Sequence, residues 1–233
     1  MQWLTKIINI KNFNILYKFL IPLLSISLAL LIFFGLKSAL INSPIDYQQG
    51  EAVRIMYIHV PAAWMALSTY FLLFIFNVSF FIWKNSLFFV ISKSIAPIGA
   101  IFTLVALITG SLWGKPIWGA WWVWDARLTS MLILFFLYLG YIMLIKSFSN
   151  SEKGHKIAAI VAIVGFVNIP IIKFSVDFWN TLHQPASIIK TGGIAIDPAM
   201  QTPLILMFGC YFNYFILMSF LNIKKELLVK KLR

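Results

Sequence analysis

Residues 94–130 read SIAPIGAIFTLVALITGSLWGKPIWGAWWVWDARLTS, an apolar run followed by a segment dense in tryptophan. Residues 94–112 can cross the roughly 30 Å hydrocarbon core of a bilayer as one helix, and a second apolar run begins at Leu128. Between them lie five tryptophans: Trp113, Trp118, Trp121, Trp122 and Trp124. This stretch therefore predicts two membrane helices joined by a tryptophan-rich connection.

The composition of the whole chain agrees with a membrane protein. Of 233 residues, 61% are hydrophobic and 11% are charged, whereas soluble proteins are about half apolar and a quarter charged. These values exclude a disordered chain. The single cysteine, Cys210, excludes an intramolecular disulfide and a Cys-x-x-Cys-His haem attachment site.

Six apolar runs are long enough to be membrane spans, and spans in lipid must be helical because their backbone groups cannot be left unpaired. The fifth is short and is interrupted by Asn168 and Pro170. Pro61 and Pro203 suit the first turn of a helix. We expect neither a cleavable signal peptide nor a separate soluble domain, so residues 1–233 should form one all-α, polytopic membrane helix bundle. The predicted spans are 19–41, 62–83, 94–112, 128–145, 156–172 and 203–223.

The distribution of basic residues predicts the orientation of the chain. Of 19 lysines and arginines, thirteen fall at the two termini and in the connections that share their side. The positive-inside rule then places both termini in the cytoplasm. The periplasmic loops become about 42–61, 113–127 and 174–202. The charge indicates topology and contact with anionic lipid, with no nucleic-acid partner. The six basic residues on the outer side are Lys37, Arg54, Lys115, Arg127, Lys173 and Lys190.

This topology brings two of the three histidines to the tryptophan-rich side. His59 and His183 both fall in predicted outer loops, whereas His155 lies in an inner basic loop and is read as a solvated surface residue. A lone loop histidine is more often a surface or hydrogen-bonded residue than a ligand. Two histidines beside an aromatic cluster make a binding site the better interpretation.

The tryptophans have a simpler interpretation as an interfacial belt, although five in twelve residues is denser than anchoring requires. If residues 118–125 are helical, Trp118, Trp122 and Asp125 share one face and form an indole shelf with Trp121 beside them. An extended loop would instead alternate the rings, and Gly114, Pro116 and Gly119 leave both conformations open. For Asp125 we favour the role of N-cap of the fourth helix over direct contact with a ligand.

A flat apolar ligand that needs two imidazoles and carries acid groups at one edge matches haem. Iron takes axial histidine ligands, and stacked indoles bury the macrocycle. His59 and His183 could approach the ring from opposite faces. Cations would then neutralise the propionates, and the candidates on the outer side are Arg127, which is next to the tryptophans, Arg54, Lys115 and Lys190.

The segment from Trp113 to Thr129 resembles the tryptophan-rich WWD signature of the haem-handling protein superfamily, and its pattern is complete here. With six spans and histidines in "YIHVPAAW" and "LHQPAS", nearly the whole chain resembles the CcmC family, the haem-delivery proteins C of cytochrome c maturation. The resemblance implies that His59 and His183 are axial haem ligands. It also implies a haem platform next to Trp113 and Arg127, made of Trp118, Trp121, Trp122, Trp124 and Asp125.

The resemblance further implies that the chain holds haem b transiently and non-covalently at the periplasmic face of the bacterial inner membrane, or of the mitochondrial inner membrane. The haem would pass to the chaperone CcmE, which docks at the first outer loop through Asp46, Gln49 and Arg54. ATP hydrolysis would belong to an ABC transporter pair, CcmA and CcmB, and the single-span CcmD would complete the assembly. The chain itself would be a haem-binding transfer protein rather than an enzyme, and it would have no ATPase of its own, since it contains no Gly-x-x-x-x-Gly-Lys-[ST] loop.

Two other functions remain open from the sequence. One is an integral haem-b electron-transfer subunit, although such subunits hold their ligands within the spans and both outer histidines here are expected in loops. The other is a membrane enzyme that acts on an amphiphilic substrate, with Asp125 or Glu51 as the acid-base group. No paired-carboxylate, Ser-His or metal-cluster spacing supports that enzyme.

Overall fold

The computed structural model describes residues 10–148, 151–184 and 195–231, and nearly all of them are helical. In these ranges six helical stretches are long and apolar enough to cross a membrane, which confirms the predicted all-α bundle with six spans. The predicted outer cation Lys190 and the middle of the 174–202 loop lie outside the described residues. The elements are α2 (Ile10–Lys37), η1 (Ser38–Asn42), η2 (Glu51–Ile55), α3 (Met56–Trp83), α4 (Ser86–Trp118), α5 (Ala126–Ser147), α6 (Glu152–Gly165), α7 (Asn168–Phe178) and α8 (Pro198–Lys231).

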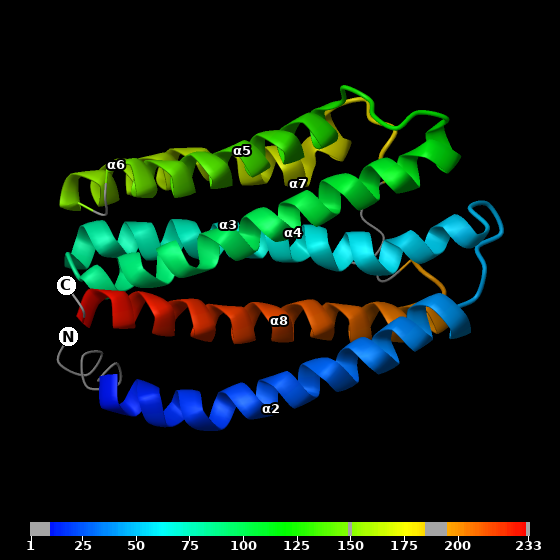
Figure 1. The fold of residues 1–233 in the computed structure, drawn as a ribbon. Helices are drawn as coiled ribbons and strands as arrows, with labels where there is room; N and C mark the ends of the chain where they lie inside the picture. Colours follow the sequence, from blue (N-terminus) through cyan, green and yellow to red (C-terminus); the bar gives the residue numbers. More distant parts are fainter. Residues whose placement is uncertain (1–9, 149–150, 185–194, 232–233) are drawn as a thin grey trace.

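The helices run roughly along one direction, and their ends form two distinct faces of the bundle (Figure 1). The blue start of α2 and the red end of α8 lie at the same end, where α2 packs against α8. The segments 43–55, 119–125 and 179–184 gather at the opposite end. We call this opposite end the loop end. The fold thus separates the connections as the sequence predicts, while the assignment of the loop end to the periplasm rests on the basic residues.

Polar residues cap the helices that begin after short connections. The side chain of Asn85 accepts a hydrogen bond from the backbone N–H of Leu87 at 3.0 Å, at the start of α4. Asp125 accepts from the backbone N–H of Leu128 at 2.8 Å, at the start of α5. Each cap satisfies one of the N–H groups that a helix start leaves without a partner. The predicted N-cap role of Asp125 is confirmed.

Several predicted helix boundaries were wrong because the helices extend beyond the apolar runs. α3 begins at Met56, so His59 lies in a helix and Pro61 lies beyond the first turn. α4 continues to Trp118, so Trp113 and Trp118 are helical as well. Hydropathy marks the part of a helix that meets lipid, and polar or aromatic turns at its end escape that signal. Pro203 likewise lies inside α8, which begins at Pro198.

The fifth span is broken where the sequence predicts an interruption. α6 ends at Gly165 and α7 begins at Asn168. The side-chain amide of Asn168 donates a hydrogen bond to the backbone oxygen of Ser130 in α5 at 2.8 Å. The polar residue that weakened the hydropathy signal therefore ties α7 to α5, as expected for a polar contact between membrane helices.

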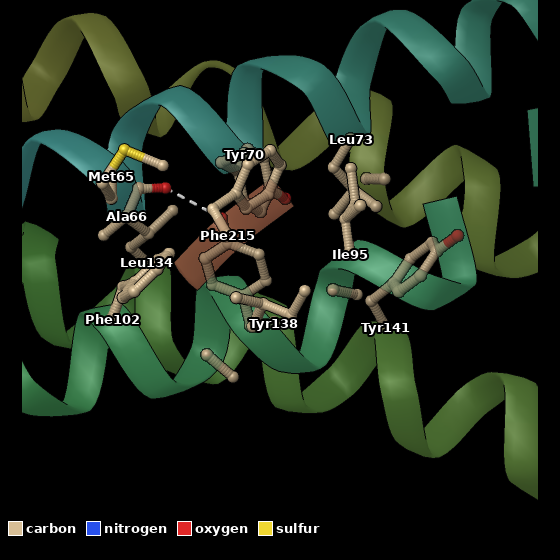
Figure 2. Packing of buried hydrophobic residues seen from close by; sticks show 14 of the residues in the cluster. Met65, Ala66, Tyr70, Leu73, Ile95, Phe102, Leu134, Tyr138, Tyr141 and Phe215 are labelled. Carbon is tan, nitrogen blue, oxygen red and sulfur yellow. Dashed lines mark hydrogen bonds between the residues drawn. The ribbon is translucent and has the colours of Figure 1, made fainter. Parts of the chain in front are cut away.

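Aromatic side chains and small residues pack the centre of the bundle (Figure 2). The rings of Tyr70 in α3 and Tyr138 in α5 meet edge to face with centroids 5.0 Å apart, and the Tyr138 hydroxyl donates to the backbone oxygen of Ala66 at 2.8 Å. Gly99 in α4 leaves the space that the Tyr138 ring fills, and Gly165 does the same for Tyr70. Small residues allow this close approach where lipid provides no hydrophobic drive between helices.

A second buried cluster lies near the loop end and fixes the first connection to the bundle. It joins residues of η1 and η2 to the start of α3 and the first half of α8. Because these side chains are buried together, segment 43–55 has an anchor on both sides. The members are Ala39, Val53, Met56, Tyr57, Met200, Leu204 and Met207.

Candidate functional site

The two histidines expected at one face come together at the loop end. His59 lies in the first turns of α3, and His183 lies in the segment that follows α7. Their ring centroids are 6.4 Å apart and their planes are inclined by 38°. Residues that are distant in the chain thus present two imidazoles to one small volume.

The ring of His59 is held against α4. Its Nδ1 lies 3.1 Å from Oγ1 of Thr109, and the Thr109 hydroxyl donates its own hydrogen to the backbone oxygen of Val105 at 2.6 Å. The Thr109 oxygen therefore accepts from His59, and Nδ1 carries the proton. A Cβ on Gly110 would lie 3.0 Å from Cε1 of His59, so glycine allows the ring to approach the helix closely.

The ring of His183 is held by its neighbouring backbone. Its Nδ1 lies 2.8 Å from the backbone oxygen of Gln184, which can only accept, and 3.4 Å from Nη1 of Arg127, which can only donate. The shorter contact is with the carbonyl oxygen, so we assign Nδ1 as the donor. Burial lowers the pKa of His183 below the ordinary 6.5, and the Arg127 cation lowers it further, against the opposing effects of the Gln184 oxygen and Asp125. The imidazole is therefore neutral at physiological pH.

Both imidazoles use Nδ1 for these hydrogen bonds, which leaves Nε2 with the lone pair that binds a metal. A hydrogen bond at the other nitrogen is the usual way in which proteins orient a ligating histidine. Two imidazoles bound to one ion, each about 2 Å away, have ring centres about 6 Å apart. The observed 6.4 Å separation matches that spacing.

Asp125 connects the segment that bears His183 to the start of α5. While its Oδ1 caps the helix through Leu128, its Oδ2 accepts a hydrogen bond from the hydroxyl of Thr181. The Thr181 oxygen in turn accepts from the backbone N–H of His183 at 3.1 Å. Asp125 thus acts on the helix and, through Thr181, on the histidine.

Arg127 lies where α5 meets the end of α7. Its Nε donates to Oγ of Ser175 at 3.1 Å, and Nη2 donates to the backbone oxygens of Ile172 and Lys173, each at 3.3 Å. Nη1 lies 3.4 Å from Nδ1 of His183. The guanidinium therefore ties the start of α5 to backbone oxygens within α7, and Nη1 faces the histidine.

Two tryptophans at the end of α4 flank the histidines. Trp113 meets His59 edge to face at 5.7 Å, and Trp118 lies 6.4 Å from His183. A Cβ on Gly114 would come within 2.9 Å of the Trp118 ring, so glycine lets that indole lie along α4. The glycines of the motif therefore set the positions of its tryptophans.

The other tryptophans lie on a non-helical loop, so of the two conformations that the sequence left open for residues 118–125 the structure has the loop and not the helical shelf. Gly119 adopts φ 75°, a left-handed conformation that ends α4. The loop then folds back along the helix, where the Ser111 hydroxyl donates to the backbone oxygen of Trp121 at 2.6 Å. The indole of Trp121 is 56% exposed and that of Trp124 is 78% exposed.

Trp122 follows Trp121 in the sequence, and its ring meets that of Trp124 edge to face at 5.6 Å. Its indole N–H is buried and has no acceptor within the described ranges. A hollow of about 260 Å³ opens next to this loop, between residues 123–125 and residues 180–182. The tryptophan-rich loop and the segment before His183 thus face each other across a recess.

The three residues of the first loop that were assigned to a partner make contacts within the chain. Oδ1 of Asp46 accepts from the backbone N–H groups of Gln48 and Gln49, each at 2.8 Å. The side-chain oxygen of Gln49 accepts from Nε1 of Trp113 at 2.9 Å. Arg54 pairs with Glu51 at 2.9 Å.

Sequence reasoning missed Thr109, Gly110 and Thr181, which hold the two histidines. Thr109 and Gly110 lie about one turn before Trp113 in the apolar run. A hydroxyl next to a glycine in that run was the sequence feature that could have indicated a close contact with the histidine. Thr181 precedes His183 by two residues, a spacing at which a hydroxyl often bonds the local backbone. Partners from other helices could not be read from that spacing.

The fold and the site define a multi-pass α-helical membrane protein that pairs two histidines within a tryptophan cluster at one end. The sequence model of the family described as CcmC, "Heme exporter protein C", matches residues 3–233. The chain belongs to this haem exporter protein C family.

Individual relatives agree with the family assignment. The haem exporter protein C of Bradyrhizobium diazoefficiens is 44% identical over 91% of this chain and 81% of its own length. That of Haemophilus influenzae is 44% identical over 89% of this chain and 84% of its own length. A ccmC-like mitochondrial protein of cytochrome c biosynthesis from Marchantia polymorpha is 52% identical over 73% of this chain and 72% of its own length.

Proposed function

We propose that this protein binds haem at the loop end, with His59 and His183 as axial ligands, and delivers it to a periplasmic haem chaperone of the CcmE type. Membership of the haem exporter protein C family supports a role in haem export and cytochrome c maturation. The histidine pair supplies the chemistry for holding the cargo.

The observation that carries the proposal is the separation of the two imidazoles, 6.4 Å between ring centres. Among the described residues, no group of three or more His, Cys, Asp or Glu side chains could hold a bare metal ion. Two histidines suffice for an iron that brings four porphyrin nitrogens of its own. The site therefore fits haem better than a free metal.

The tryptophans supply the surface for the macrocycle. Trp121 and Trp124 expose their rings at the loop end, and an exposed indole can stack on a porphyrin face. The buried N–H of Trp122 and the Nη1 group of Arg127 are donors suited to the carboxylates of the cargo.

The cargo is haem b held without a covalent bond. The single cysteine, Cys210, is buried in α8 and no second cysteine exists to form a paired thioether site. Ligation by imidazoles is reversible, and this suits a protein that must release what it binds.

Handover would take place next to the first outer loop. Asp46 fixes the turn of this loop, and Gln49 ties it to Trp113, so its outer residues are presented on a fixed backbone. Tyr47 is 91% exposed there. An aromatic side chain held in the open is suited to a protein partner.

The rest of the machinery would be supplied by partners. The sequence contains no phosphate-binding loop of the Gly-x-x-x-x-Gly-Lys-[ST] type, so ATP hydrolysis falls to the CcmA and CcmB pair, with CcmD completing the assembly. The protein then acts in the inner membrane of a bacterium, or of a mitochondrion, with the loop end in the periplasm or its mitochondrial equivalent.

An absorption spectrum of the purified protein tests the proposal. We expect the bands of bis-imidazole haem in the wild-type protein and loss of haem in His59→Gly and His183→Gly, with partial recovery when imidazole is added. His155→Gly is the matched control, because His155 lies on α6 at the end of the bundle opposite the loop end (Figure 1). Unchanged haem content and spectra in both His59 and His183 variants would contradict the ligand assignment.

One observation favours the alternative of an electron-transfer subunit: His59 lies in a spanning helix rather than in a loop. A redox titration separates the two functions. Haem that cycles rapidly with quinol would support the electron-transfer subunit, and haem that moves to an added CcmE-type chaperone would support delivery.

A further inference from the structure

The two histidines are held in different ways. His59 belongs to the continuous helix α3, its ring is bonded to Thr109 of α4, and it packs against Gly110 and Trp113. Both the backbone of His59 and its ring are therefore fixed by contacts with helices.

His183 does not itself belong to a helix, although its ring lies beside Trp118 of α4 and Arg127 of α5. α7 ends at Phe178, and residues 179–184 carry no regular secondary structure. Leu182 is 56% exposed and Trp179 is 52% exposed, so the segment is not anchored by burial of its large apolar side chains. Segments of this kind open at a low free-energy cost.

What restrains this segment is a chain of side-chain hydrogen bonds. The Thr181 hydroxyl donates to Asp125 and accepts from the backbone N–H of His183 at 3.1 Å. Asp125 is fixed in turn because its other oxygen caps α5 through Leu128. A bond from a hydroxyl to a carboxylate is among the stronger hydrogen bonds in proteins.

We propose that Thr181 is a positioning residue that holds His183 in place through Asp125, and that His183 is the exchangeable axial ligand while His59 is the fixed one. This inference rests on the proposed function. When the Thr181 contact opens, the bond between iron and Nε2 of His183 breaks, and a nitrogen of an incoming imidazole takes its place without transfer of electrons. The start of α5 thereby controls which side of the haem becomes accessible.

Amide hydrogen exchange of the haem-free protein tests the anchoring role of Thr181. In Thr181→Val, which keeps the shape but removes the hydroxyl, we expect exchange of residues 179–184 to become roughly tenfold faster. Residues 56–61 should exchange as in the wild type, and Thr181→Ser should restore protection. Thr202→Val, at an exposed threonine in α8, is the matched control. If residues 179–184 exchange at the wild-type rate in Thr181→Val, the anchoring role is overturned, and Thr181→Ala repeats the measurement if the valine variant does not accumulate.

Ligand replacement on haem-loaded protein tests the difference between the two histidines. After addition of carbon monoxide to the haem-loaded protein reduced to the ferrous state, we expect substitution at one axial position to be roughly tenfold faster in Thr181→Val, with little change in Thr109→Val. A larger acceleration in Thr109→Val would make His59 the exchangeable ligand and overturn the inference. Amide exchange is measured on haem-free protein, so a negative result there contradicts only the anchoring role of Thr181. Absence of the bis-imidazole spectrum would instead contradict the proposed function.

Discussion

The indole N–H of Trp113 donates a hydrogen bond to the side-chain oxygen of Gln49 at 2.9 Å. This contact joins segment 43–55 to the end of α4, where Trp113 also packs against His59. The loop proposed for chaperone docking is therefore bonded directly to the helix beside the histidine pair.

Removing this bond should loosen the loop without unfolding the bundle. In Gln49→Leu the indole loses its acceptor, at a cost of about 1 kcal/mol, and we expect trypsin to cleave after Arg54 several times faster. Gln48→Leu is the matched control, because Gln48 is the exposed neighbour. Equal cleavage rates in the two variants would show that the Trp113 contact does not restrain the loop.

Asp125 should contribute to stability through its cap. Asp125→Ala removes the acceptor for the Leu128 N–H, so we expect a loss of about 1 kcal/mol and a lower thermal midpoint in detergent. Asp125→Asn keeps a capping oxygen and should lose less. Asp177→Ala removes an exposed carboxylate in α7 and should leave the midpoint close to that of the wild type. A similar midpoint for the alanine variants at both positions would argue against the cap.

Gly99 should tolerate no side chain, because Tyr138 occupies the space a Cβ needs. Tyr138 is fully buried and bonded to Ala66, so it cannot move aside. We expect Gly99→Ala to cost about 1–3 kcal/mol, measured as a lower thermal midpoint. Gly140→Ala is the control, since no atom lies within 4 Å of its Cβ position and alanine favours the helix. A midpoint for Gly99→Ala equal to that of Gly140→Ala would refute the packing argument.

His183 should titrate below its ordinary pKa of 6.5 because it is buried and faces Arg127. The folded protein resists protonation more than the unfolded chain does, so the contribution of neutral His183 to stability is complete above 6.5 and is lost as the pH falls through the lower folded value. Histidine NMR of the haem-free protein measures this midpoint. Arg127→Met removes the cation that also lowers the pKa of His183, so it should raise the titration midpoint. A wild-type midpoint at or above 6.5 would contradict the lowered pKa of His183.

Much of the fold could be predicted because each membrane helix is a long apolar run, which gives the sequence a high hydropathy there. The six apolar runs predicted six spans, and the broken fifth run corresponds to the separate helices α6 and α7. The helix ends could not be predicted, because the polar and aromatic turns that extend α3 to Met56 and α4 to Trp118 do not differ in composition from loops. His59 was therefore placed in a loop although it is helical.

By itself the sequence determined the membrane class, the number of spans and the grouping of His59 and His183 with the tryptophans, because apolar runs and the placement of basic residues can be read from the order of residues along the chain. The tertiary structure decided which atoms meet. That Thr109 orients His59, that Asp125 reaches His183 through Thr181, and that Gly114 and Gly119 turn the tryptophans all depend on packing between segments far apart in the chain. Such contacts are set by three-dimensional geometry, which local sequence spacing does not encode.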